Sequence, residues 1–145
     1  MSTGAISRCY FFYKVVRNNE MNKFTDFLFF TNLSLLVIHE LDAIRRKEWR
    51  LFIFLKDLKD ELAYQIFALL HLPFLLLIFW FLTQESVSSQ FYFQVVVDIF
   101  LIIHLGLHLL LRDHEHNHFA GKFSKRIIQS MAFFGAAHLG LNMIY

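Results

Sequence analysis

Four long apolar segments constrain what this chain can fold into more than any other feature. They lie at about 24–44, 61–82, 91–111 and 124–144 of the 145 residues. An α-helix needs about 20 apolar residues to cross a hydrocarbon core of roughly 30 Å. Hydrocarbon offers no partners to the backbone, so a spanning segment of this kind must be helical. The sequence therefore predicts an all-α, polytopic bundle of four transmembrane helices.

Composition agrees with a membrane protein and excludes other classes. Hydrophobic residues make up 57% of the chain, against about 45–50% in soluble domains. The lipid bilayer is therefore the first expected partner, and the net charge of +2 indicates no nucleic-acid partner. Cys9 is the single cysteine, which excludes both an intrachain disulfide and a metal cluster built on thiolates.

The domain organisation is simple. We expect one four-helix membrane domain over residues 21–145, preceded by a tail over residues 1–20 that is not needed for the fold. Met21 is then a candidate start of the protein. Residues 48–55, EWRLFIFL, indicate a short interfacial helix between the first two spans. Glu48 and Arg50 flank Trp49 at the interface, and we interpret them as anchors rather than catalytic residues.

Basic residues predict the orientation of the helices. The loops 45–60 and 112–123, with the first residues of the fourth span, hold ten Lys and Arg residues, and the loop 83–90 holds none. Cytoplasmic loops carry an excess of Lys and Arg. We therefore expect these two loops in the cytoplasm and both chain termini outside.

Polar residues form one stripe on each predicted span, and every span carries histidine. The histidines of the four spans are His39, His71, His104 with His108, and His138. Ionisable residues within a span are costly and usually face the interior of a bundle. Ala132, Ala136 and Gly140 form a ridge of small residues on the fourth span, which predicts close helix contact there.

The histidines and nearby carboxylates predict a metal site that opens to the cytoplasm. His104 and His108 are spaced i, i+4, so one ion can bind both, and His39 and His71 supply candidate ligands from two further helices. Imidazole and carboxylate donors without thiolates suit Zn, Fe or Mn. Glu40 and Asp42 are the candidates for a general base or a further ligand. The candidates for second-shell hydrogen bonds to the ligands are Asp98, Asn32, Tyr64 and His138.

Less specific interpretations stand beside this one. Asp42 can pair with Arg46 at i, i+4, His138 can be a neutral contact between helices, and the polar run 113–118 can be a solvated loop. The leading hypothesis is a metal-dependent membrane enzyme, a hydrolase or oxidoreductase acting on a lipid-soluble substrate. The alternatives are a b-type haem electron carrier, a proton- or ion-conducting protein, and a structural membrane subunit.

Three strings resemble those of a known family. They are HELDAIRRKEWR (39–50), LLHLPF (69–74) and DIFLIIHLGLHLLLRDHEHNHF (98–119). They are similar to strings of an uncharacterised bacterial family of small four-span membrane proteins without an assigned function. The resemblance covers most of residues 21–145, and HELDA with EWR is its most specific part. It implies the four-span fold and a location in the bacterial inner (plasma) membrane, and it implies no reaction.

Overall fold

The fold consists of helices joined by short connections. The computed structural model describes residues 3–114 and 121–144, with side chains from residue 23 on. Its elements are α1 (Thr3–Arg46), the 3₁₀ helix η1 (Glu48–Leu51), α2 (Asp60–Leu82), α3 (Val87–Leu110) and α4 (Lys122–Ile144). The predicted polar loop falls largely on residues 115–120, outside the described part of the chain.

The predicted fold class is confirmed. Each of the four α-helices contains a segment long and apolar enough to cross a membrane, which in α1 is Lys23–Arg46. The described residues contain no strand. Four such helices fit an integral membrane protein.

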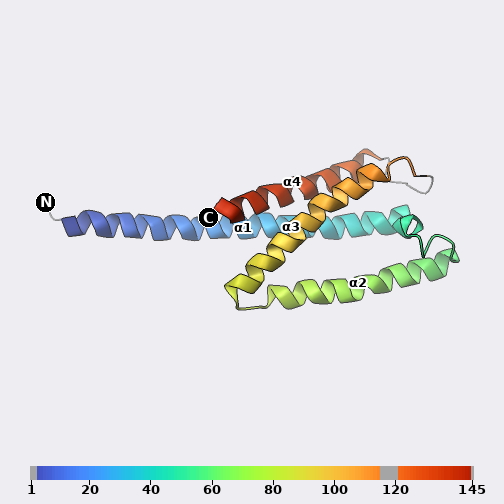
Figure 1. The fold of residues 1–145 in the computed structure, drawn as a ribbon, viewed down its shortest axis with the longest axis horizontal. Coiled ribbons are helices and arrows are strands. Elements are labelled where there is room, and N and C mark those ends of the chain that lie inside the picture. The colour runs from blue at the N-terminus through green and yellow to red at the C-terminus, as the bar shows by residue number, and fades with distance from the viewer. Residues whose placement is uncertain (1–2, 115–120, 145) are drawn as a thin grey trace.

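Helices α1, α3 and α4 form the packed part of the bundle (Figure 1). In the figure α2 lies apart from α1, and α3 crosses the bundle diagonally from the α2–α3 turn to α4. Only 11% of the most apolar stretch of α2 is buried, against 39% for α1. Most of the apolar surface of α2 is therefore available to lipid.

Spacing along α1 explains its buried stripe. The buried residues repeat at alternating intervals of three and four, at Phe29, Asn32, Leu36, His39 and Ala43. This repeat keeps side chains on one face of a helix that has 3.6 residues per turn. The same stripe therefore brings a polar side chain into the interior at two depths, with Leu36 between them.

Gly135 of α4, and not the full predicted ridge, allows a close helix approach in this bundle. A Cβ added to Gly135 of α4 would lie 3.2 Å from the Asn32 amide and 3.3 Å from the Asp98 carbonyl oxygen. Ala136 is exposed, and a Cβ on Gly140 would meet nothing within 4 Å. The prediction of close contact along the ridge is therefore wrong at these two positions, because the buried face of α4 lies on the side of Gly135 and His138.

The connection from α1 to α2 is a tight elbow. Lys47 has the left-handed backbone conformation, with φ 57°, which ends α1 and turns the chain into η1. Trp49 is 4% exposed and packs against Tyr64 and Phe67 of α2. The Trp49 ring therefore fills the space between the elbow and α2.

Asp60, the first residue of α2, holds this elbow in place. Its carboxylate accepts hydrogen bonds from Lys47 Nζ at 2.6 Å and from Arg50 Nη2 at 2.7 Å. Arg50 also donates to the carbonyl oxygens of Lys56 and Leu58. The elbow is thus tied to the start of α2 on both sides of Glu48, which fixes where the Glu48 side chain can reach.

Candidate metal centre and cavity

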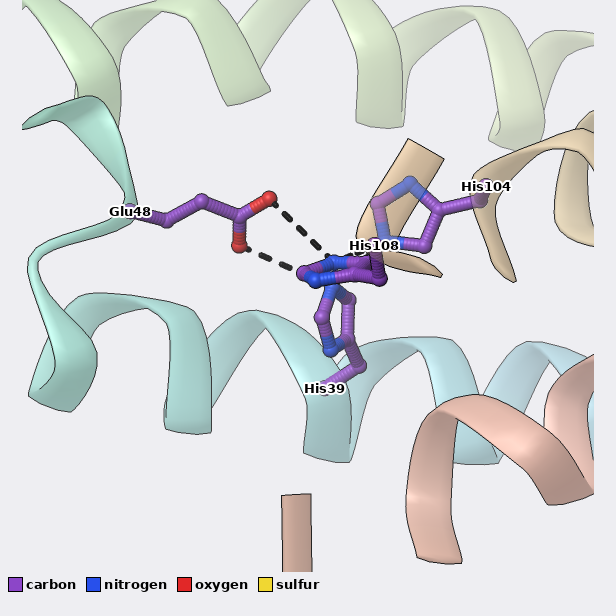
Figure 2. Close-up of side chains that lie close together, drawn as sticks. All are labelled: His39, Glu48, His104 and His108. Atoms are coloured by element: carbon purple, nitrogen blue, oxygen red, sulfur yellow. Dashed lines mark hydrogen bonds and ion pairs between the residues drawn. The ribbon is translucent and has the colours of Figure 1, made fainter. Parts of the chain in front are cut away.

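Three histidines and one glutamate meet at the end of the bundle that carries the elbow. Residues His39 of α1, Glu48 of η1, and His104 and His108 of α3 each offer one ligand atom, and these atoms lie within 4.8 Å of one another. We call them the four-donor cluster. Figure 2 shows Glu48 reaching across from the elbow toward the imidazoles on α1 and α3.

The nitrogen atoms in this cluster cannot all be satisfied by hydrogen bonds to one another. His104 Nε2 lies 2.7 Å from His39 Nε2 and 3.1 Å from His108 Nε2. A ring nitrogen carries either one hydrogen or one lone pair. His104 Nε2 can therefore form one linear hydrogen bond, not both. A cation would instead accept a lone pair from every nitrogen at once.

The spacing of the donors also fits one ion. Ligand bonds of about 2.1 Å in a tetrahedral arrangement place the donor atoms about 3.4 Å apart. The nitrogens are 2.7 and 3.1 Å apart, and the Glu48 oxygens lie 3.6 Å from His39 Nε2 and 3.7 Å from His108 Nε2. All four ligand atoms lie within 4.8 Å of one another, so the donor set could hold a metal ion.

Glu48 is the member of the cluster that the sequence did not indicate as functional. It is 8% exposed, and burial, together with the neighbouring carboxylates of Glu40 and Asp42, raises the pKa of Glu48 to about 8. A buried carboxylate without a cationic partner is costly. Glu48 is nine residues after His39 and follows a turn, so no helical periodicity connects the two in the sequence.

His71 lies near the cluster but is engaged elsewhere. Its Nδ1 is 2.7 Å from the carbonyl oxygen of Phe67, and its Nε2 is 2.6 Å from Glu40 Oε2. The carbonyl oxygen can only accept a hydrogen bond, so Nδ1 carries a hydrogen. One further proton lies between Nε2 and the Glu40 carboxyl group. Both ring nitrogens are used, and the four-donor cluster does not include His71.

The other candidate base, Asp42, has a different environment. Its Oδ1 lies 3.5 Å from Arg46 Nε, at the i, i+4 spacing. Among the described residues, its buried Oδ2 has no hydrogen-bond partner. This geometry agrees with the alternative in which Asp42 has a structural role and pairs with Arg46.

Two of the four residues predicted to hydrogen-bond to the metal ligands, Asp98 and His138, lie in a separate group deeper in the bundle. Asp98 and His138 are fully buried, with Asp98 Oδ2 2.6 Å from His138 Nδ1. Asn142 donates to His138 Nε2 at 3.3 Å and to Gln94 Oε1 at 3.2 Å. We call the residues Gln94, Asp98, His138 and Asn142 the Asp98 cluster.

Asn32 and Tyr64, the other two residues predicted to orient the metal ligands, have contacts elsewhere. The Asn32 amide bonds to the backbone of α4, to Met131 O and Gly135 N, each at 3.1 Å. Tyr64 packs on Trp49. Asp98 lies about 9 Å along α3 from His104, and Leu36, Leu101 and Met131 pack together in the core between the two levels. These side chains therefore stand apart from the imidazoles they were predicted to orient.

A cavity of about 440 Å³ adjoins the four-donor cluster. Its polar lining consists of Glu40, Glu48, His71, His104 and His108. The rest of the lining is apolar: Leu51, Phe52, Phe67, Leu70, Phe74, Phe100, Leu107 and Leu111. The cavity thus combines two of the three clustered imidazoles with the Glu40–His71 pair and a hydrophobic wall.

Comparison with known proteins gives a family and no activity. No curated protein and no solved structure matches this chain. Residues 25–145 match the family of unknown function DUF6713. The resemblance expected from the three sequence strings, which all fall within this range, is confirmed. The chain therefore belongs to the DUF6713 family of unknown function.

Proposed function

We propose that this protein is a metal-dependent membrane enzyme that acts on a lipid-soluble substrate. The observation that carries the proposal is the four-donor cluster beside an apolar cavity. Its donors are imidazoles and a carboxylate, which favours Zn, Fe or Mn. We propose as its ligands three of the histidines predicted from the sequence, His39, His104 and His108, together with Glu48.

The residues around the cavity suggest how a reaction proceeds. A bound ion would polarise an oxygen atom of the substrate or of water. Glu40 lines the cavity and shares a proton with His71 at 2.6 Å, so this pair can accept a proton and return it. This favours Glu40 as the general base over Asp42, which is engaged with Arg46.

The same contacts favour a metal ion over haem. The rings of His39 and His104 are in edge-to-face contact, with centroids 4.7 Å apart. A porphyrin between these two rings would have to separate them. The proton-path alternative is disfavoured by the apolar layer of Leu36, Leu101 and Met131 between the two polar levels.

Elemental analysis of the detergent-purified protein, together with its optical spectrum, tests the proposal. We expect about one Zn, Fe or Mn per chain, and loss of that metal in His104→Ala. The control is His71→Ala, which should keep the metal because the imidazole is engaged with Glu40 and Phe67. A colourless protein without bound metal would contradict the proposal, and a Soret band would indicate haem.

We also propose an orientation. The two loops at the cluster end of the bundle and the helix ends that adjoin them contain the ten basic residues outside the N-terminal segment, which supports a cytoplasmic location for the centre. In a Cys9→Ser background, a membrane-impermeant thiol reagent added outside should label Ser86→Cys and not Asp113→Cys. Labelling of Asp113→Cys alone would reverse the orientation.

A further inference from the structure

We infer that the cavity binds the hydrocarbon chain of a single-chain acyl lipid, which enters between α2 and α3 from the membrane. The position of the lipid's polar end rests on the proposed metal function, whereas the chain site rests on the cavity itself. A fatty acid and its ester both fit this description, because each has a carboxylate or carbonyl oxygen at the end of one long hydrocarbon chain.

The cavity walls suit a chain. The lining of α3 runs from Phe100 to Leu111, which is roughly 16 Å of helix. Facing it, α2 contributes Phe67, Leu70 and Phe74, and Phe52 covers the elbow end. A volume of about 440 Å³ lies at the small end of ligand sites, roughly 300–1,000 Å³, which favours one chain over two.

Aromatic pairs close the cavity toward the α2–α3 turn. Phe74 and Phe100 are in contact across the two helices, with centroids 6.3 Å apart, and Phe81 stacks on Phe93 at 5.1 Å nearer the turn. From that turn the two helices diverge toward the other end of the bundle (Figure 1). The contact between Phe74 and Phe100, which both line the cavity, therefore bounds it on the side of the α2–α3 turn.

The opening lies on the membrane-facing side. Leu70 and Leu107 both line the cavity, yet they are 52% and 47% exposed. Both belong to the segments that can span a membrane. Within a membrane these two side chains would lie at the level of the hydrocarbon, so a lipid chain could reach the cavity between α2 and α3 without entering water.

Polar groups gather at only one end of the lining. His104, His108 and Glu48 lie on one side, and the Glu40–His71 pair completes the group. A divalent ion bound by three neutral imidazoles and one carboxylate keeps a net positive charge, which attracts a carboxylate or carbonyl oxygen. An acyl lipid has this oxygen at the end of its apolar chain, so its two parts match the two parts of the cavity.

Photolabelling with a diazirine-bearing fatty acid tests the inference on the purified full chain in lipid nanodiscs. We expect labels within residues 67–74 and 100–111 that an excess of unlabelled palmitate removes. Methyl palmitate as a second competitor distinguishes the neutral ester from the free acid. Leu107→Trp should reduce the competable labelling at least fivefold by filling the opening. Leu109→Trp is the matched control, because Leu109 is exposed on α3 outside the cavity lining.

The outcomes separate the two proposals. If Leu107→Trp does not fold, Leu70→Trp with Leu69→Trp as its control repeats the test from α2. Labelling that palmitate cannot displace, or equal labelling of both Trp variants, overturns the chain site even if the protein contains metal. Competable labelling in a protein that contains no metal supports the chain site and contradicts the metal function.

Discussion

Two groups of buried polar residues lie within this membrane bundle, and they are built on opposite principles. In the Asp98 cluster unlike groups pair: a carboxylate with an imidazole, and an amide with the second imidazole nitrogen. In the four-donor cluster three like nitrogens converge with a carboxylate beside them. Like nitrogens cannot all satisfy one another, so the four-donor cluster calls for a group that accepts several lone pairs at once.

Access to the outside separates the two groups as well. Asp98 and His138 are fully buried, with 0% exposed side chains. His104 and His108 line the cavity between α2 and α3. The comparison indicates that the paired polar groups fasten α3 to α4, whereas the converging donors occur where the loosely packed α2 leaves room for a ligand.

The largest expected effect is on metal affinity. His108→Ala should weaken metal binding more than about 100-fold. Removing a residue that only hydrogen-bonds to a metal ligand already lowers metal affinity about 10–100-fold, and His108 is a proposed ligand itself. The fold should persist, because the spans depend on apolar length and on internal backbone bonds. Metal competition with a calibrated chelator measures the affinity, and helical content by circular dichroism checks the fold. An unchanged metal affinity would contradict the assignment of the four-donor cluster, and not the Asp98 cluster, as the metal site.

In the Asp98 cluster the expected effect is on stability. His138→Ala leaves a buried carboxylate unpaired and should lower the free energy of unfolding by about 2 kcal/mol. Asp98→Asn keeps a hydrogen-bonding partner of the same shape, so it should cost only about 0.6 kcal/mol, the average for a membrane hydrogen bond. Reversible unfolding in mixed micelles measures both values. Loss of metal in Asp98→Asn would show that this group also serves the centre.

Helix approach at Gly135 gives a smaller effect. Gly135→Ala should lower the free energy of unfolding by about 1–2 kcal/mol, because the added methyl group overpacks the contact with Asn32 and the Asp98 carbonyl. Gly140→Ala is the matched control on the same helix, since open space surrounds that position. Equal stabilities of the two variants in the same unfolding assay would disprove the close packing around the Asp98 cluster.

The smallest expected effect comes from the elbow. Asp60→Ala removes the acceptor of Lys47 and Arg50 and so loosens the position of Glu48. Exposed ion pairs contribute little, so metal affinity should fall less than about tenfold. Glu48→Gln, which removes the ligand charge itself, should reduce the affinity more than Asp60→Ala does in the same chelator titration. The reverse order would assign Glu48 a structural role.

Much of the candidate site follows from helical periodicity. His104 and His108 are one turn apart on one helix, so their proximity is local and predictable. His39 could be assigned to an inward face because a charged or polar stripe on a span rarely faces lipid. Glu48 could not be found in this way, because its place depends on the left-handed turn at Lys47 and on the contacts of Asp60.

The sequence by itself determined the four helices, their apolar length and which polar side chains face inward, since these depend on composition and on the 3.6-residue period. Only the tertiary structure decided which of these inward-facing residues contact one another. It paired His71 with Glu40 and His138 with Asp98, and it brought Glu48 to His39, His104 and His108. The physical reason is that the helix crossing angles and the shape of the elbow arise from contacts between segments far apart in the chain. The 3.6-residue repeat describes one helix at a time and does not predict such contacts.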